Sequence, residues 1–254
     1  MATFGPDDDL RGARFVDADL GGARFLRTNI SGAVLREAFV DDVEIDAPWL
    51  AEGDGRLVVN GVDVVPLVEA ELDRRFPGRA LRTARVAATL REAWAALETT
   101  WARLLERVDA MPAGTVDECV DGEWTFAQTL RHLVLATDAW LGRSILHLEQ
   151  PFHPLGLAGA GTEDDDLDRT LLTTGTPTYD EVLEARASRQ ALVRDFLATA
   201  ADDDLATQQR NPWGDYPETT LSCLHTILDE EWSHQRYAVR DLDAVESRAT
   251  AGSD

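Results

Sequence analysis

The chain has 254 residues, 44% of them hydrophobic, and its 47 acidic residues outnumber 24 lysines and arginines to give a net charge of −23. This length and composition allow one large buried core or two modest ones. So strong a negative charge repels phosphate backbones and anionic lipid, and it therefore argues against nucleic-acid binding through a basic patch.

Cysteine content and hydropathy bear on the cellular compartment of the protein. Its two cysteines, Cys119 and Cys223, are far apart in the sequence and lack CxxC spacing, so no disulfide framework is expected. The first thirty residues contain no apolar run of the signal-peptide type, and no stretch reaches eighteen consecutive apolar residues. We therefore expect a cytoplasmic protein that has no contact with membranes.

The first fifth of the chain repeats every five residues. A bulky apolar residue recurs at this interval, and a small residue, mostly alanine, precedes it by two positions. The bulky positions are Leu10, Phe15, Leu20, Phe25, Ile30, Leu35, Val40 and Ile45. A period of five matches neither a helix nor a strand and indicates a repeat architecture. The segment resembles the pentapeptide-repeat family, which implies a short right-handed quadrilateral β-helix of about two coils over residues 1–47, with the bulky side chains inside.

Residues 48–82 are predicted to connect this repeat to the rest of the chain. Within them, β-branched residues flank Asn60 and Gly61, which is a strong signal for a short hairpin. Pro66 can then open a short helix that ends at Arg75.

From residue 83 to 245, apolar residues are spaced three and four apart, as in amphipathic helices. Four long helices are predicted, over about residues 83–110, 125–148, 178–200 and 217–245. A 27-residue loop, 151–177, follows the second helix and is long enough to act as a lid or to carry a short helix. The chain is therefore predicted to be mainly α, with a four-helix bundle that contains a long crossover connection. Residues 246–254 are expected to form a disordered tail.

Two of the predicted helices begin with the spacing of a capping box. Thr125 is followed three residues later by Gln128, and Thr178 is followed by Glu181. In such a box the two side chains satisfy backbone N–H groups that the first helical turn leaves without partners. We therefore place the starts of these two helices at the threonines.

The last predicted helix carries ionisable residues in the middle of its apolar stripe. Glu230 and His234 are one turn apart on one face, close enough to bind a single ion. Buried carboxylates are costly unless they are paired or bound to a metal. Glu231 points nearer to the centre of the stripe than Glu230, so the residues alone leave the choice between the two glutamates open. His225 lies on nearly the opposite side and is expected to serve the core or an interface.

Three features of the predicted bundle resemble the DinB superfamily, and more narrowly its branch that contains mycothiol-dependent maleylpyruvate isomerase. They are the pair Trp124-Thr125, His132 seven residues after that threonine, and the E-x₃-H pair of Glu230 and His234. The resemblance implies a divalent metal between the second and fourth helices, with His132, Glu230 and His234 as ligands. We expect Glu231 or Asp229 to lie beside these ligands and support them. Without the resemblance His132 would not stand out, because it lies off the apolar arc of its helix.

Two histidines and one carboxylate leave a fourth coordination position open, as a catalytic zinc site requires, and they also suit other divalent first-row ions such as iron(II). The resemblance, which covers about residues 83–242, implies a zinc-dependent transferase or isomerase that uses a low-molecular-weight thiol, such as mycothiol, and a small electrophile. The alternative is a non-enzymatic protein in which the metal stabilises the bundle and the acidic repeat binds a protein partner. The oligomeric state stays open, with a homodimer among the alternatives.

Overall fold

The computed structural model describes residues 3–5, 7–51, 53–159 and 166–251. Its chain divides into two compact units, residues 1–46 and 47–254. We call them the repeat unit and the helical unit. The division lies one residue before the end of the predicted repeat.

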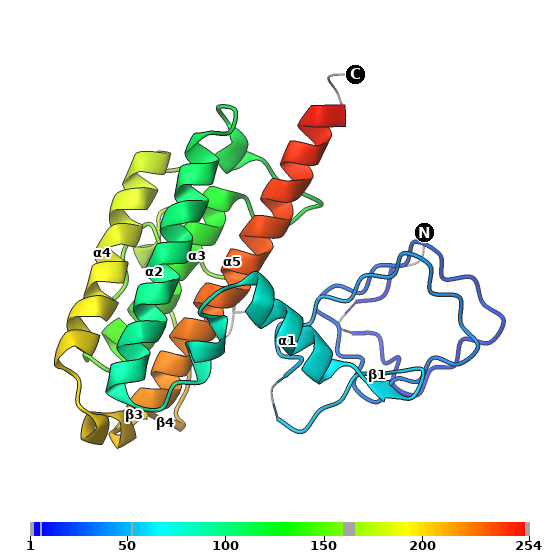
Figure 1. Ribbon diagram of the computed structural model, residues 1–254, viewed down its shortest axis with the longest axis horizontal. Coiled ribbons are helices and arrows are strands. Elements are labelled where there is room, and N and C mark those ends of the chain that lie inside the picture. The colour runs from blue at the N-terminus through cyan, green and yellow to red at the C-terminus, as the bar shows by residue number, and fades with distance from the viewer. Residues whose placement is uncertain (1–2, 6, 52, 160–165, 252–254) are drawn as a thin grey trace. The chain divides into compact units, whose positions relative to one another are not determined.

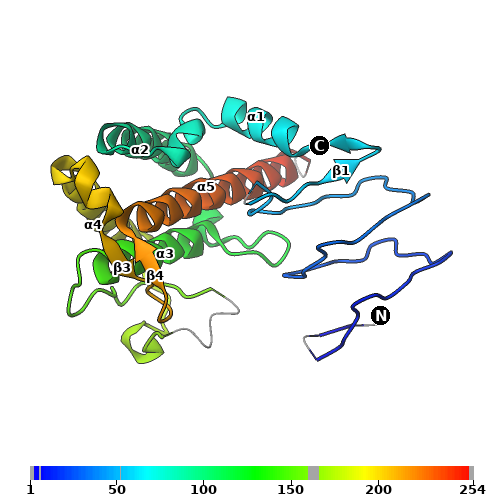
Figure 2. The same cartoon turned by 90° about the horizontal axis from the view of Figure 1, so that it is seen from below.

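The backbone of the repeat unit has the five-residue period of its sequence. Positive φ angles recur at Gly12, Asp17, Gly22, Arg27, Gly32, Glu37 and Asp42. Three turns are closed by alanine N–H groups that donate to the carbonyl oxygens of Leu10, Leu20 and Ile30 at 2.9–3.0 Å. The chain therefore winds with regular corners, seen in dark blue in Figure 1 and edge-on in Figure 2.

The predicted inward packing of this unit is wrong. Phe15, Phe25 and Leu35, which were expected inside the coils, are 58%, 63% and 71% exposed. Among described residues 3–5 and 7–46, none belongs to a β-strand. Without strands in this described part, no sheet layer covers the bulky side chains as stacked repeats do in a longer solenoid. The quadrilateral β-helix stays a prediction.

The helical unit opens with the predicted hairpin. Strand β1 (Val58–Val59) pairs antiparallel with β2 (Val62–Asp63). Between them Asn60 and Gly61 have φ angles of 51° and 85°, as the two central residues of a type I′ turn require. Helix α1 (Val65–Arg75) follows, with a proline in its first turn.

Four longer helices form the body of the unit, which is mainly helical (Figure 1). They are α2 (Ala87–Asp109), α3 (Phe126–Thr137), α4 (Tyr179–Thr199) and α5 (Thr220–Ala251). Helices α2 and α3 each contact both α4 and α5. The side chains between them form one core, which includes Leu90, Trp94, Trp101, Leu130, Leu133, Val193, Leu224 and Ile227. No helix in the described part of the chain combines the length and apolar character needed to cross a membrane.

Both capping boxes are confirmed. At α3, the Thr125 N–H donates to the Gln128 side chain at 2.9 Å, and the Gln128 N–H donates to the Thr125 hydroxyl at 3.2 Å. At α4, the N–H of Thr178 donates to the Glu181 carboxylate at 2.8 Å, and the return bond is present. The residues that satisfy the first turn therefore fix where these helices begin.

The ends of two predicted helices differ from the prediction. Helix α3 changes at Asp138 into a π-helical segment, Asp138–Arg143. Helix α5 continues through Ala251, so residues 246–251 of the predicted disordered tail are helical, while residues 252–254 lie outside the described residues. The apolar stripe ends near Val245, but exposed polar residues with adequate helix propensity can extend a helix beyond its packed part.

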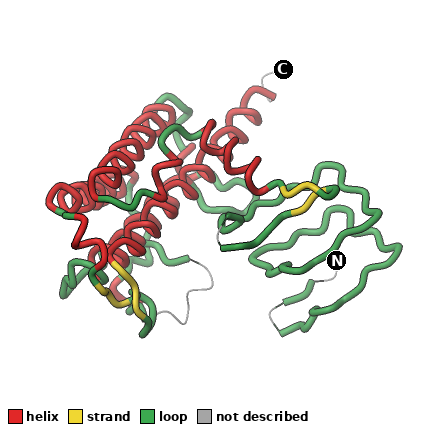
Figure 3. The backbone as a smooth tube through the Cα atoms, turned by 60° about the horizontal axis from the view of Figure 1, so that its bottom comes forward, coloured by secondary structure: helices red, strands yellow, loops and turns green. Residues whose placement is uncertain are grey.

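Short elements connect the helices. The 3₁₀ turns are Arg79–Thr83, Thr115–Asp117, Arg169–Leu171 and Asp202–Ala206. The third of them is a short helix within the loop 151–177, of which residues 160–165 lie outside the described residues. A hairpin of β3 (Gln208–Arg210) and β4 (Pro217–Thr219), seen in yellow in Figure 3, stands before α5. Pro217–Thr219 therefore forms a strand instead of the first helical turn that was predicted.

Candidate metal centre

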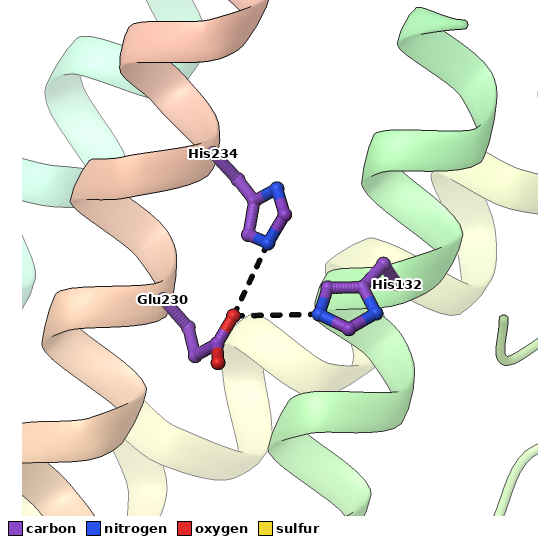
Figure 4. Close-up of side chains that lie close together, drawn as sticks. All are labelled: His132, Glu230 and His234. Atoms are coloured by element: carbon purple, nitrogen blue, oxygen red, sulfur yellow. Dashed lines mark hydrogen bonds and ion pairs between the residues drawn. The ribbon is translucent and has the colours of Figure 1, made fainter. Parts of the chain in front are cut away.

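Three side chains from two helices converge at one point (Figure 4). His132 comes from α3, and Glu230 and His234 come from α5. One carboxylate oxygen of Glu230, Oε2, lies 3.3 Å from His132 Nε2 and 3.2 Å from His234 Nε2. All three possible ligand atoms lie within 4.8 Å of one another. The structure therefore brings together the three residues that the sequence singled out.

The two helices position these side chains for different reasons. Glu230 and His234 are four residues apart, so one turn of α5 places them on the same face. His132 reaches them because α3 packs against α5. The side chains of His132, Glu230 and His234 are 17%, 32% and 14% exposed. The cluster is thus largely covered yet keeps some access to solvent.

The tautomer of His132 is fixed by a backbone carbonyl. His132 Nδ1 lies 3.0 Å from the carbonyl oxygen of Leu157, and because that oxygen can only accept, Nδ1 must carry the proton. In a neutral ring Nε2 then has its lone pair directed at Glu230 and His234. This is the arrangement in which a histidine binds a metal through one nitrogen while its other nitrogen is held in place.

The electrostatics of the cluster favour deprotonated donors. Burial alone would raise the pKa of the Glu230 carboxyl, but its hydrogen bonds and charge interactions with His132 and His234 outweigh burial and lower that pKa. Burial lowers the pKa of His234, although the neighbouring Glu230 carboxylate opposes this effect. An ionised Glu230 and a neutral His234 are the forms that bind a metal ion.

Aromatic rings hold the two imidazoles in place. The Trp124 ring stacks on His234 at 5.9 Å between centroids, with 19° between the planes, and lies 4.8 Å from the His132 ring. Tyr237 meets His234 edge-on at 5.5 Å. These contacts restrict rotation of both rings and cover part of the site with apolar surface.

The neighbouring acidic residues have arginine partners. Glu231 is 1% exposed, and its carboxylate accepts a hydrogen bond from Arg186 of α4. Asp229 lies 3.5 Å from Arg82. A supporting role of Glu231 or Asp229 beside the ligands stays a prediction. Burial raises the pKa of Glu231, while the charge of Arg186 opposes that rise.

His225, as expected, is remote from this cluster in its contacts. Its Nε2 lies 2.7 Å from the carbonyl oxygen of Ala84, just before α2. It therefore ties α5 to the start of α2, which is a structural role in the core.

The geometry of the cluster fits a metal ion. Ligand bonds of about 2.0–2.2 Å at roughly tetrahedral angles separate neighbouring ligand atoms by about 3.3–3.6 Å. The two nitrogen–oxygen distances of 3.3 and 3.2 Å are close to that separation. When His132 is neutral and protonated at Nδ1, the lone pair of its Nε2 faces the Glu230 carboxylate, and a cation between them would take the place of the hydrogen bond that a doubly protonated ring donates. The donor set therefore fits a divalent ion held by three protein ligands.

Sequence reasoning missed one participant and undervalued two others. The Leu157 carbonyl gives no sequence signal, because every residue has a carbonyl and only the path of the loop brings this one to His132. Trp124 was part of the motif, but its contact with both histidine rings depends on packing between α3 and α5. Tyr237 follows His234 by three residues, and that spacing alone could have placed the two side by side.

Comparison with known families agrees with this geometry. A family model of the DinB superfamily matches residues 96–238, which is more than half of the chain and includes all three residues of the cluster. A model of pentapeptide repeats matches residues 9–43 as eight copies. No curated protein and no solved structure gives a significant match. The chain therefore belongs to the DinB superfamily and carries an N-terminal segment of pentapeptide repeats.

Proposed function

We propose that His132, Glu230 and His234 bind a divalent first-row metal ion, zinc in the first place, and that the centre serves an enzyme. The reaction would be a transfer or an isomerisation that uses a low-molecular-weight thiol, such as mycothiol, with a small electrophile. The observation that carries the proposal is the convergence of three donor atoms around one point, with nitrogen–oxygen distances of 3.3 and 3.2 Å.

The number and type of donors support a catalytic centre over a structural one. Structural zinc sites have four protein ligands, whereas catalytic zinc sites have three and keep one position open. When bound, such an ion would lower the pKa of a thiol at that position and so supply a thiolate nucleophile at neutral pH. The membership in the DinB superfamily is consistent with a metal-binding role.

The residues of the chain would contribute charge, orientation and exclusion of water. One carboxylate and two neutral histidines reduce the charge of a divalent ion from +2 to +1, which still attracts an anionic sulfur. The Leu157 carbonyl holds His132 in its ligating tautomer. The Trp124 ring contacts both imidazoles, so it shields part of the centre from solvent.

Metal content tests the proposal directly. The protein should be purified without a metal-binding tag and examined by elemental analysis, and about one divalent ion per chain is expected. His234→Ala should lose that ion, because it removes a donor. His225→Ala is the matched control on the same helix, since His225 bonds to the Ala84 carbonyl instead of the cluster. Full retention of metal by His234→Ala would refute the proposed centre.

The open position can be tested with a spectroscopic probe. The protein is loaded with Co²⁺ and titrated with mycothiol, glutathione and cysteine. Direct ligation by sulfur should produce a charge-transfer absorption that an alcohol of similar size does not produce. A metal-loaded protein whose spectrum no thiol alters would leave the metal centre standing and remove the thiol chemistry.

A second candidate is a non-enzymatic role, favoured by the surface of the repeat unit. Its bulky side chains are widely exposed, up to 98% for Phe39, and exposed apolar surface of this extent is typical of sites that bind other proteins. In this case the metal would stabilise the helical unit and the acidic repeat would bind a protein partner. A photo-crosslinking residue in place of Phe39 should then capture a partner in cells, and the Co²⁺ spectrum should not respond to thiols.

A further inference from the structure

The segment of residues 151–157 lies along the helix that carries His132, and its contacts end at the metal centre. At its start, Pro151 packs beside Gly142 of the π-helical segment, and the His153 N–H donates to Asp138 Oδ2 at 2.7 Å. Further along, Arg131 of α3 bonds to the segment twice. Its Nε donates to the Leu155 carbonyl at 2.9 Å, and its own carbonyl accepts from the Leu157 N–H at 3.2 Å. The last residue of the segment also supplies the carbonyl that accepts from His132 Nδ1. These contacts therefore connect the π-helical segment after α3 to His132, a proposed metal ligand.

The strongest of these anchors is a buried carboxylate. Asp138 is 1% exposed, and both of its oxygens are occupied. Oδ2 accepts the backbone N–H of His153, and Oδ1 accepts from Arg189 Nε of α4 at 2.6 Å. A buried carboxylate is costly unless its hydrogen bonds and charge are satisfied. Here a single side chain joins three parts of the fold: the end of α3, α4 and the segment 151–157.

Close packing holds the rest of the segment against the helix. A Cβ atom on Gly156 would lie 3.2 Å from Leu135 Cδ1 and 3.2 Å from the His153 carbonyl oxygen. Any larger side chain at this position would push the segment away from α3. Leu157 is the next residue, so such a shift would act directly on the carbonyl that fixes His132.

We propose that Asp138 is a positioning residue of the metal centre. It anchors the segment 153–157 on α3, and the Leu157 carbonyl at the end of that segment then keeps His132 in the tautomer whose Nε2 faces Glu230 and His234. This inference rests on the proposed metal site and adds to it a residue that contacts neither the metal nor its ligands. Loss of a partner that orients a ligating histidine typically weakens metal affinity about 10–100-fold.

Asp138→Asn tests the anchor, because its amide keeps the shape of the side chain but has a single acceptor oxygen for two donors, the His153 N–H and Arg189 Nε. We expect its affinity for Zn²⁺, measured by competition with a chelator, to fall about 10–100-fold. Gly156→Ala disturbs the same segment without touching any charge, and its affinity should change in the same direction. If Asp138→Asn does not fold, the Zn²⁺ affinity of Gly156→Ala decides the proposal.

Glu98→Gln is the matched control for a general loss of stability. Glu98 of α2 also pairs with an arginine of α4, Arg194 at 2.9 Å, but within the described part of the chain no hydrogen bond or ion pair joins it to the segment 151–157. Its Zn²⁺ affinity and its Co²⁺ absorption spectrum should match those of the wild type. If Asp138→Asn has the affinity and spectrum of this control, the proposal is overturned.

The tautomer of His132 gives a readout that needs no metal. Imidazole ¹⁵N chemical shifts of the metal-free protein should show His132 protonated at Nδ1 in the wild type and a mixture of tautomers in Asp138→Asn. An unchanged tautomer in that variant would overturn the inference. A wild type that binds no metal would refute the proposed function, and the tautomer measurement would still decide whether Asp138 positions His132.

Discussion

The repeat unit and the helical unit are both strictly periodic, yet they treat their apolar residues in opposite ways. Along α2, residues spaced three and four apart enter one core, and Leu90, Trp94 and Trp101 are at most 2% exposed. In the repeat unit the bulky residue of every five is between 45% and 71% exposed from Leu10 to Ile45. The difference lies in the facing layer: helices α4 and α5 pack against α2, whereas the bulky residues of the repeat unit have no comparable cover in its described part.

The comparison also explains where a functional site can be built. A site needs side chains held within narrow limits by their neighbours. In the helical unit, Trp124, Tyr237 and the Leu157 carbonyl hold the two histidines. The repeat unit has a regular backbone, but the bulky apolar side chains in its described part are exposed instead of packed.

The largest effect is expected from emptying the core of the helical unit. Trp101 is 2% exposed and packs near Phe126 and under the Arg186 guanidinium. Trp101→Ala should lower the free energy of unfolding by about 3–5 kcal/mol, because it leaves a cavity and removes a large apolar side chain from the core. Urea denaturation followed by circular dichroism would measure the loss. A loss below about 1 kcal/mol would mean that this core is much looser than its burial implies.

Acid should act on the metal centre next. Burial lowers the pKa of His234 from 6.5, so its neutral form persists to a lower pH than that of an exposed histidine. Because the pKa of His234 is lower in the folded state than in the unfolded state, the folded protein favours the neutral ring. The stability of the fold is therefore unaffected by this group above pH 6.5 and decreases as the pH falls toward the lowered pKa. Below that pKa, Zn²⁺ affinity should fall by about tenfold per pH unit for each competing proton. Competition with a chelator from pH 8 to 5 would measure this Zn²⁺ affinity. Loss of Zn²⁺ binding already above pH 7 would contradict the lowered pKa of His234.

Removing the repeat unit should have a smaller effect. Deletion of residues 1–46 should leave the helical unit folded, because the core of that unit is formed by its own helices. The expected change in unfolding free energy is below about 1 kcal/mol, which corresponds to about 2–4 °C in melting temperature. Thermal melts of the full chain and the truncated chain would show it. An unfolded truncated chain would mean that the two units are one cooperative domain.

The smallest effect is expected within the repeat unit itself. Phe39 is 98% exposed, so Phe39→Ala should change the stability by no more than about 0.5 kcal/mol. The same urea titration used for Trp101→Ala would place both variants on one scale. If Phe39→Ala costs as much as a core substitution, its side chain is covered in solution and the contrast between the two units is smaller than the structure indicates.

Local sequence was sufficient for features that depend on near neighbours. The periods of five and of three to four, the hairpin at Asn60 and Gly61, and the capping boxes at Thr125 and Thr178 all depend on residues a few positions apart. The same is true of Glu230 and His234, since the pitch of a helix places residues four apart on one face. Such features follow from backbone geometry, which is the same in every protein.

Packing decided what local sequence left open. Only the position of Arg186 on α4 shows that Glu231 belongs to a core ion pair and that Glu230 is free to face the histidines. His132 meets Glu230 across 98 residues of chain, and the Leu157 carbonyl reaches His132 by the path of a loop. These contacts depend on how helices and loops pack against one another, as does the exposure of the repeat. The sequence by itself therefore determined the elements and the chemistry of the candidate ligands, whereas the tertiary structure decided which donors meet and which apolar residues are covered.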